Sequence, residues 1–494
     1  MRVNQRPVPT GYEIVQEVLE KSKRGGETNK RILGLPFPSL TSAQVAAHLN
    51  RDGSRWNDSN HNGKVELTYE FTDDEPSNFE ELKREDSGYN VDLIPLTLSQ
   101  QEFIRKAHQE YADVANVTFT EKGRGTGEGH LTYRVFVPRD KNYPDLGFAI
   151  KPDLDHPEQQ GGIWLQHQGQ RAKLGNRSDS DVDATSDELW RGVLLHELGH
   201  AVGLSHTHFE KDEVDEFFHY MENFRNYTVM SYNAPTIGAT GDGPQAVSLM
   251  IDDMQAVQSI YGANHSTRKG NTTYGFNSNT DREHYSLKTS QDQPLFAVWD
   301  GGGWDTLDFS EFTQDQTINL NEGALSSVGG LQRNVGIAQG VTIEEARGGK
   351  GKNTLIGNAA FNILRGGKDR DVLYGGSGGA KMWGGEGADT FVFDATSSGK
   401  PNVVMDFVSG TDKIDLSGMR RQSGVLNLVS RLRLQHKKPQ NPNNPTFFTQ
   451  PGDVLVNYNR TAQQTLLRMD TTGDGKMDMH INVRGIVRHE DIVV

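Results

Sequence analysis

The chain has 494 residues, and its 51 basic and 66 acidic side chains give a formal net charge of −15 at pH 7. Because single hydrophobic cores rarely grow beyond about 250–300 residues, this length predicts two or more domains. The acidic balance argues against general nucleic-acid or anionic-membrane binding, and the absence of cysteine excludes disulfides and thiolate metal ligands.

The N-terminal half predicts mixed α and β structure. Its first 30 residues hold no apolar run of signal-peptide length, and no window of the chain reaches the roughly 18 apolar residues of a membrane span. We therefore expect neither Sec export nor a transmembrane segment. Helical spacing occurs at 12–19, 40–49 and 99–115, and strand-like alternation occurs at 64–71, 116–121 and 131–137.

A further helix is predicted at 186–202, with Thr185 and Glu188 as its capping box. It carries HELGH, in which His196 and His200 are four residues apart, so both imidazoles project from one face toward a shared ion. Without cysteine, zinc must use histidine and oxygen. Glu197 lies next to His196, within reach of a water that the zinc activates for attack on a carbonyl.

The residues after HELGH sharpen this interpretation, because HExxH alone is only moderately specific. Gly203 can adopt the left-handed conformation that ends the helix and reverses the chain, so that His206 returns to the same ion. The result is a three-histidine site with an open fourth position, as a catalytic zinc requires. His208 lies beyond the turn, and a fourth imidazole would close that position, so we expect a loop histidine there.

Downstream, the stretch YTVMSY supplies Met230 and Tyr232. A methionine before polar residues usually packs in a core at a turn. Beside the extended zinc motif, it resembles the methionine turn of metzincins.

Glycine becomes dense from about residue 264, and we place a domain boundary near 265. Residues 348–392 form five nine-residue units, GGKGKNTLI, GNAAFNILR, GGKDRDVLY, GGSGGAKMW and GGEGADTFV. A recurring apolar eighth position predicts tiny strands facing a core, and the GGxGxD half predicts turns that face calcium. Stacked units would form a parallel β-roll. The sixth positions are imperfect, which predicts fewer or weaker calcium sites; they are Asn353, Asn362, Asp371, Ala380 and Asp389.

These motifs together resemble the serralysins, secreted bacterial zinc metalloproteases with a C-terminal RTX calcium-binding β-roll. The likeness extends over nearly the whole chain and includes YADVANVTFTE at 111–121, HELGHAVGLSH at 196–206, VMSY at 229–232, IYGAN at 260–264, TYGFNSNTDR at 273–282 and DFVSGTDKIDLS at 406–417. It implies an α+β metzincin-type catalytic domain at 1–264 and an all-β parallel β-roll domain at 265–494. About the first ten residues would be a propeptide.

For the zinc site, the resemblance implies one catalytic Zn²⁺ held by His196, His200 and His206. Glu197 would be the general base and Met230 the floor beneath the metal. Tyr232 would be a further zinc ligand at rest and would stabilise the oxyanion once a peptide binds.

The resemblance also implies several structural Ca²⁺ ions. The first site would use Arg268, Gly270, Thr272, Asp300, Gly302, Gly303 and Asp305, and the next Gly340, Thr342 and Glu344. In the repeats the ligands would be Gly349, Gly351, Asn353, Gly367, Asp369, Asp371, Gly385, Gly387 and Asp389, with Asp406 and Asp412 as weaker candidates.

The implied route to the outside is type I export, read from an uncleaved C-terminal signal, with calcium folding the repeats after export. The implied partners are protein and peptide substrates, the type I secretion apparatus and a small periplasmic protein inhibitor, and the chain would be a monomer. Thr207 stands where the family has proline, followed by an acidic loop at 208–216. Two rivals are a calcium-dependent RTX surface or adhesion protein with a non-catalytic zinc site, and an RTX lipase suggested by GGSGG at 375–379.

Overall fold

The computed structural model describes residues 9–25, 31–32, 35–36, 38–75, 91–139, 146–153, 160–167, 187–208, 220–235, 245–397, 400–422, 433–435, 453–470 and 477–494. Contacts divide the chain into two compact units. One comprises 24–267 and 295–301 and is called the catalytic unit, because it holds most of the catalytic domain that the resemblance implies. The other, the coil unit, comprises 1–23, 268–294 and 302–494. The first 23 residues thus go with the C-terminal part of the chain, which differs from the expected division into 1–264 and 265–494.

The catalytic unit has mixed helices and strands, as the sequence predicts. Its elements are β1 (Arg31–Ile32), β2 (Leu35–Pro36), α2 (Ser42–Leu49), β3 (Val65–Phe71), β4 (Val91–Ile94), α4 (Leu98–Val114), β5 (Val117–Glu121), β6 (Leu131–Pro138), β7 (Gly147–Ala149), β8 (Gly162–Gln166), α5 (Asp187–Ala201), α6 (Ile251–Tyr261) and β10 (Phe296–Val298). The predicted helices at 40–49 and 99–115 correspond to α2 and α4. Each begins at a threonine capping box, in which the hydroxyl of Thr41 or Thr97 accepts a hydrogen bond from a backbone amide three residues on.

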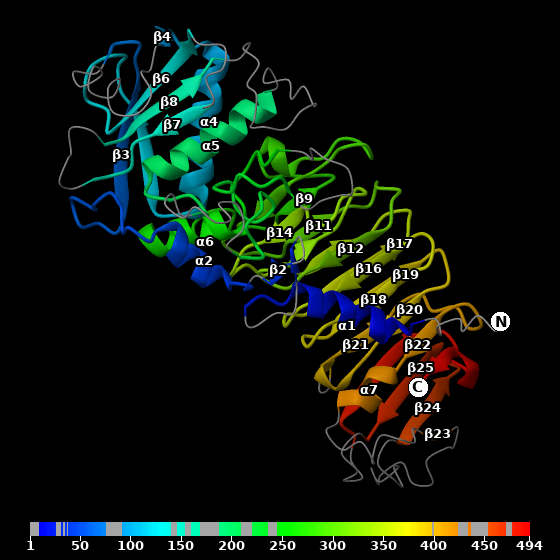
Figure 1. The fold of residues 1–494 in the computed structure, drawn as a ribbon. Helices are drawn as coiled ribbons and strands as arrows, with labels where there is room; N and C mark the ends of the chain where they lie inside the picture. The colour runs from blue at the N-terminus through cyan, green and yellow to red at the C-terminus, as the bar shows by residue number, and fades with distance from the viewer. Residues whose placement is uncertain are drawn as a thin grey trace. The chain divides into compact units, whose positions relative to one another are not determined.

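The central sheet of this unit has the strand order β5-β3-β6-β8-β7, and β4 also pairs with β6. Strands β5, β3, β6 and β8 run parallel, while β7 pairs with β8 antiparallel at the edge. Helix α5 packs against β7 and β8 and contacts α4, whereas α2 packs on α6. Figure 1 shows α5 running beside these two strands, at the β7 end of the sheet.

The coil unit is rich in short strands. Its elements are α1 (Gly11–Ser22), β9 (Thr273–Gly275), η1 (Glu283–Tyr285), β11 (Thr306–Asp308), β12 (Gln316–Asn319), β13 (Leu325–Ser326), β14 (Val335–Ile337), β15 (Glu345–Arg347), β16 (Asn353–Ile356), β17 (Asn362–Gly367), β18 (Val372–Tyr374), β19 (Ala380–Gly385), β20 (Thr390–Val392), η2 (Ala395–Ser397), β21 (Asn402–Val404), β22 (Lys413–Asp415), α7 (Ser417–Gln422), β23 (Arg433–Gln435), β24 (Asp453–Asn459), β25 (Gln464–Met469), β26 (Met479–Arg484), η3 (His489–Asp491) and β27 (Ile492–Val493).

From β15 to β22, successive strands alternate between two sheets. The first sheet contains β9, β11, β15, β17, β19 and β21 as parallel neighbours and continues through β26, β25, β24 and β23. The second contains β12, β16, β18, β20, β22 and β27. Thr354 pairs with Val372 and Asn362 with Ala380, so one coil of the chain takes two nine-residue repeats. The recurring apolar position lies inside, as expected, and its five side chains are fully buried: Leu355, Leu364, Leu373, Met382 and Phe391.

Helix α1 covers the second sheet (Figure 1). Tyr12 and Val15 pack on Ile356, Tyr374 and Val392. The backbone amide of Tyr12 donates to the Asp415 carboxylate at 3.0 Å, so the positive end of the helix meets an anion. The helix therefore completes the hydrophobic core of the coil unit. Over the described residues, no helix is both long and apolar enough to cross a membrane.

Candidate metal centre

Helix α5 and the turn after it bring three histidines together. His196 and His200 lie one helical turn apart on α5, and Gly203 follows with φ of 104°. A β-carbon on Gly203 would also lie 2.2 Å from the carbonyl oxygen of Ser54. Glycine is therefore required there both for the backbone conformation and for the close approach, and the reversal returns His206 to the helix. The predicted cap residue Thr185 lies outside the described residues.

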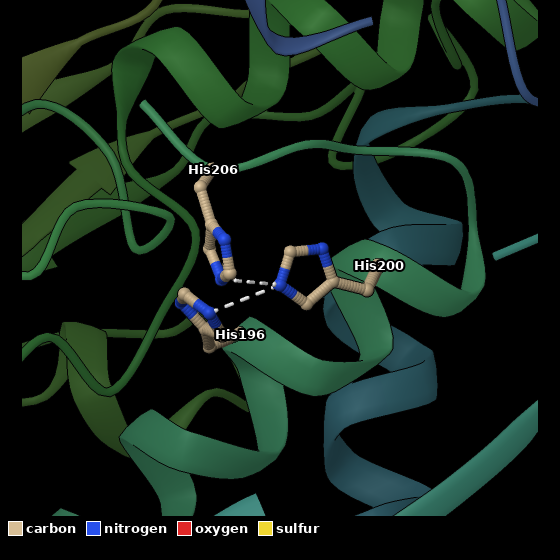
Figure 2. A group of neighbouring side chains, drawn as sticks. All are labelled: His196, His200 and His206. Atoms are coloured by element: carbon tan, nitrogen blue, oxygen red, sulfur yellow. Dashed lines mark hydrogen bonds between the residues drawn. The ribbon is translucent and has the colours of Figure 1, made fainter. Parts of the chain in front are cut away.

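The three rings face one another through their Nε2 atoms (Figure 2). Nε2 of His200 lies 3.1 Å from Nε2 of His196 and 2.9 Å from Nε2 of His206, and the ligand atoms of the group all lie within 4.8 Å of one another. Three neutral nitrogen donors at this spacing fit a tetrahedral zinc with one open position. The predicted triad is thus brought together by the fold.

Backbone carbonyls hold the other ring nitrogens. Nδ1 of His196 lies 2.8 Å from the carbonyl oxygen of Val229, and Nδ1 of His200 lies 2.7 Å from that of Leu204. A carbonyl only accepts, so both rings carry their proton on Nδ1 and keep the Nε2 lone pair for a metal. Burial lowers the pKa of His196 to about 4, and it lowers the pKa values of His200 and His206 far below their usual range. The triad is therefore neutral at physiological pH.

Tyr232 lies beside the triad, with its hydroxyl oxygen 2.7 Å from Nε2 of His206 and its side chain 47 % exposed. It is thus close to the metal position and open to solvent on its other side. His208 is placed differently from the triad: its ring stacks on His206 at a centroid distance of 4.8 Å and lies 5.0 Å from the ring of Tyr232. The acidic loop at 209–216 lies outside the described residues.

Glu197 is buried and lies against the edge strand β7. A β-carbon at Gly147 would lie 3.0 Å from Cγ of Glu197 and 3.1 Å from its Oε1. Gly147 thus leaves room for the carboxylate between α5 and the edge of the sheet. Sequence reasoning did not find this glycine, because nothing in the local pattern relates it to a helix fifty residues further on.

Met230 is fully buried beneath α5. A β-carbon at Gly199 would lie 2.6 Å from Sδ of Met230 and 3.1 Å from the hydroxyl of Tyr111, and that hydroxyl donates to the carbonyl of Leu195 at 2.8 Å. The glycine within HELGH therefore lets the methionine approach the helix closely. The role of Met230 as the floor beneath the metal stays a prediction.

A buried carboxylate supports the methionine segment. Asp253, on α6, accepts hydrogen bonds from Thr228 Oγ1 at 2.6 Å, from the backbone amide of Val229 at 2.8 Å and from that of Met250 at 2.9 Å. Burial raises the pKa of Asp253 to about 7. Sequence reasoning missed it, since an aspartate in the first turn of a helix is common for helix-dipole reasons alone.

The last turn of α2 and the residues directly after it hold the loop that carries His206. Arg51 Nη1 donates to the carbonyl of His206 at 2.7 Å and Nη2 to that of His208 at 3.2 Å. Nε2 of His48 lies 2.8 Å from the carbonyl of Thr207, which is fully buried. Asn50 Nδ2 donates to the carbonyl of Gly203 at 2.9 Å. The roles of His48, Asn50 and Arg51 in holding this loop were not predicted from the sequence.

In the coil unit, the candidate calcium carboxylates form a ladder. The backbone amides of Asn353, Asp371 and Asp389 donate to the carboxylates of Asp371, Asp389 and Asp412 at 2.7, 2.9 and 3.0 Å. The second oxygens of Asp371 and Asp389 are buried without a hydrogen-bond partner. Burial, together with neighbouring carboxylates, raises the pKa of Asp371 to about 8 and that of Asp389 to about 6. Such orphaned oxygens fit a cation between the turns.

The glycines of these turns allow close stacking. Gly367, Gly385 and Gly387 have φ of 122°, 99° and 144°, and β-carbons there would lie 2.2, 2.2 and 1.8 Å from carbonyl oxygens of the preceding coil. Asp369 also has positive φ, at 61°. Asp406 accepts from the backbone amides of Gly384 and Gly385. The ladder thus stacks carbonyl and carboxylate oxygens along one edge.

At the head of the coil unit, Asp305 accepts from the backbone amide of Thr272 at 2.8 Å, and its own amide donates to Glu344 at 2.8 Å. A β-carbon at Gly303 would lie 2.4 Å from the carbonyl oxygen of Gly270. These candidates are neighbours. Arg268, Gly302, Gly340 and Thr342 belong to the same unit, whereas Asp300 belongs to the catalytic unit.

Comparisons with known proteins bear on this site. The family model described as Peptidase M10 serralysin C terminal matches residues 263–494. The chain is 40 % identical over 505 residues to Metalloprotease AprA of Pseudomonas entomophila, covering 98 % of this chain and 96 % of that protein. It is 42 % identical over 390 residues to Serralysin of Photorhabdus luminescens, covering 76 % of each. It is 35 % identical over 489 residues to Serralysin A of Dickeya chrysanthemi, covering 97 % and 94 %.

A histidine triad on a helix and its following turn, beside a buried glutamate, defines the chain as a zinc metalloendopeptidase. It belongs to the serralysin family. The adhesion and lipase rivals are thereby set aside.

Proposed function

We propose that the chain is an extracellular protease that hydrolyses peptide bonds at the triad, with Glu197 as general base and Tyr232 as oxyanion stabiliser. The observation that carries the proposal is the convergence of three Nε2 atoms beside the hydroxyl of Tyr232. Zinc held by His196, His200 and His206 would supply a Lewis acid that acidifies water and polarises the carbonyl.

The residues of the chain would then move the protons. Glu197 takes a proton from the attacking water as the new carbon–oxygen bond forms, and passes it to the amine that leaves when the carbon–nitrogen bond breaks. The phenol of Tyr232 donates a hydrogen bond to the oxygen on which negative charge develops. Its partial exposure leaves room for it to move away from His206.

The test compares Glu197→Gln with Glu188→Gln, a matched control at an exposed position of the same helix. Hydrolysis of casein by the Glu197 variant should fall about 10²–10⁴-fold while zinc content is unchanged, and the control should retain activity. Tyr232→Phe should lower kcat more than it raises KM. Full activity of the Glu197 variant with bound zinc would contradict the mechanism.

We further propose that the coil unit is an RTX β-roll that folds with calcium. The buried, unpartnered oxygens of Asp371 and Asp389 support this. Calcium would also be held at the head by Asp305 and Glu344 with neighbouring backbone oxygens. The same proposal has three further parts. Low calcium in the cytoplasm delays folding, so that the chain can leave through a type I apparatus. About ten N-terminal residues are removed, and a small periplasmic protein inhibits the enzyme.

Calcium dependence is tested on the full chain, because α1 contributes to the core of the coil unit. Circular dichroism and hydrogen exchange are compared in millimolar calcium and in chelator. We expect β16, β18 and β20 to exchange rapidly only in chelator. Equal protection in both conditions would contradict the proposal.

A further inference from the structure

The repeats of the coil unit have two sets of turns, one on each side of the coil, where the chain passes from one sheet to the other. The turns 348–353, 366–371, 384–389 and 406–412 lead into the second sheet, and the turns 357–362, 375–380 and 397–402 lead into the first. The latter three read GNAAFN, GGSGGA and SSGKPN and contain no carboxylate. We call them the asparagine edge, after Asn358, Asn362 and Asn402.

In the turns that contain Asn358, Asn362 and Asn402, side-chain amides donate hydrogen bonds to backbone carbonyl oxygens. Asn358 Nδ2 donates to the carbonyls of Leu320 at 3.0 Å and Ile343 at 2.9 Å. Both acceptors lie in the segment that joins β12 to β15, one coil earlier, so this one amide links its own turn to both ends of the preceding connection. The Oδ1 atom of Asn358 accepts from the backbone amide of Ala360 at 2.9 Å, which fixes the orientation of its amide group.

Asn362 extends the same network. Its Nδ2 atom lies 3.3 Å from the carbonyl oxygen of Ile343 and 3.4 Å from that of Glu344, and its Oδ1 accepts from the backbone amide of Asn358 at 2.8 Å. In the third turn, Asn402 Nδ2 donates to the carbonyls of Ser397 and Lys400, both at 3.2 Å. The asparagines at 358, 362 and 402 are all buried.

The physical roles of an amide and of Ca²⁺ overlap here. Each satisfies carbonyl oxygens that converge from stacked turns, but calcium needs six to eight oxygens, usually with carboxylates to balance its charge. The carbonyl oxygens of this edge already accept hydrogen bonds, and no carboxylate is present in its turns. They therefore supply neither enough free oxygens nor the negative charge that calcium needs. An amide donates two hydrogen bonds and carries no charge, so its contribution depends on neither calcium nor pH.

The first turn of the opposite edge shows the same substitution. Asn353 Nδ2 lies 2.7 Å from the carbonyl oxygen of Gly351, 3.1 Å from that of Gly366, 3.3 Å from that of Gly349 and 2.9 Å from Asp371 Oδ1. Two amide protons thus face four oxygens. Two of these oxygens, those of Gly349 and Gly351, are among the calcium ligands that the resemblance implies.

We propose that asparagine amides replace calcium along the asparagine edge and at Asn353, so that calcium in the repeats is confined to the turns carrying Asp371, Asp389 and Asp412. This rests on the proposed β-roll and refines it. On one side of the coil, hydrogen bonds from asparagine would link the turns. On the other side, calcium ions would link them.

The test measures bound calcium per chain by equilibrium dialysis, together with the thermal midpoint of the coil unit at a saturating and at a limiting calcium concentration. Asn358→Ala/Asn362→Ala should bind as much calcium as the unmodified chain and should lower both midpoints by similar amounts. A fall in bound calcium would overturn the proposal. Asn402→Ala provides the same readout if the double variant does not fold.

Two further variants separate the inference from the proposal on which it rests. Asp371→Asn should bind less calcium than the unmodified chain, because it removes a carboxylate whose second oxygen is buried without a hydrogen-bond partner. Unchanged calcium in this variant would refute the β-roll itself, whatever the asparagine variants do. Asn353→Asp should bind one more calcium ion, and an unchanged or lower count would refute the replacement at that turn.

Discussion

The carboxylate of Asp253 accepts a hydrogen bond from the backbone amide of Val229 at 2.8 Å. The carbonyl of the same Val229 accepts from Nδ1 of His196. One buried aspartate on α6 is thereby linked, through a single residue, to a ring of the histidine triad.

Replacing Asp253 with asparagine should therefore weaken the metal centre. If the asparagine oxygen keeps the two backbone N–H groups, its NH₂ must face Thr228 Oγ1, which now donates to Asp253 and already accepts from the amide of Met230, and the charge of the carboxylate is lost. Loss of partners that orient metal ligands typically costs 10- to 100-fold in affinity or activity. Zinc affinity by competition with a chelator should fall in that range, whereas Ser259→Ala, on the exposed side of α6, should leave it unchanged. Equal zinc affinity of both variants would show that Asp253 does not position the triad.

Removing the guanidinium of Arg51 should accelerate zinc release. Arg51 holds two carbonyls of the loop, including that of His206 itself. In Arg51→Ala this loop loses two charge-assisted hydrogen bonds, and we expect zinc to dissociate about ten times faster. Arg55→Ala, an exposed neighbour, is the control. The idea fails if stopped-flow zinc release is the same in both.

Acid should destabilise the catalytic unit through His108. This histidine is buried, stacked on Phe119 at 4.2 Å and 2.8 Å from the Tyr133 hydroxyl, and burial lowers its pKa to about 3. Between pH 6.5 and 3 the unfolded chain binds a proton that the folded chain rejects, so stability is lost as pH falls. The loss attributable to His108 is about 2 kcal/mol by pH 5.

Urea unfolding from pH 7 to pH 5 checks this value. His108→Gln should be less stable than the unmodified chain at pH 7, because it loses the ring stacking, but its stability should change less with pH. Parallel pH curves for the two proteins would exclude His108 as the titrating group.

Shortening a buried side chain of α1 should destabilise the coil unit and not the catalytic unit. Val15 is fully buried against the second sheet, and Val15→Ala should cost about 2 kcal/mol from lost burial and the cavity left behind. Hydrogen exchange should then accelerate in β18 and β20, with β3 and β6 unchanged. Glu17→Ala, which removes only an exposed ion pair with Lys21, should have little effect. Faster exchange confined to the catalytic unit would contradict the assignment of α1.

The sequence allowed the triad to be predicted because its geometry is local: a four-residue helical step, then a reversal at Gly203. The repeats were predictable for a similar reason, since a period of nine residues repeats the same environment at Leu355 and Leu364. Arg51 and Asp253 act through backbone groups more than 20 residues away along the chain. Their identities, a surface arginine and a helix-start aspartate, are ordinary, so only the tertiary structure reveals their roles. The placement of α1 was likewise hidden, because its apolar face fits any core.

The hydrogen bond from the amide of Tyr12 to Asp415 joins residues 403 positions apart. It closes a loop of nearly the whole chain, and such non-local contacts form late, after the entropy of closure has been overcome. Helix α1 has no surface to pack on until the second sheet exists. Protection of α1 from hydrogen exchange thus marks the moment at which the coils of the coil unit are complete.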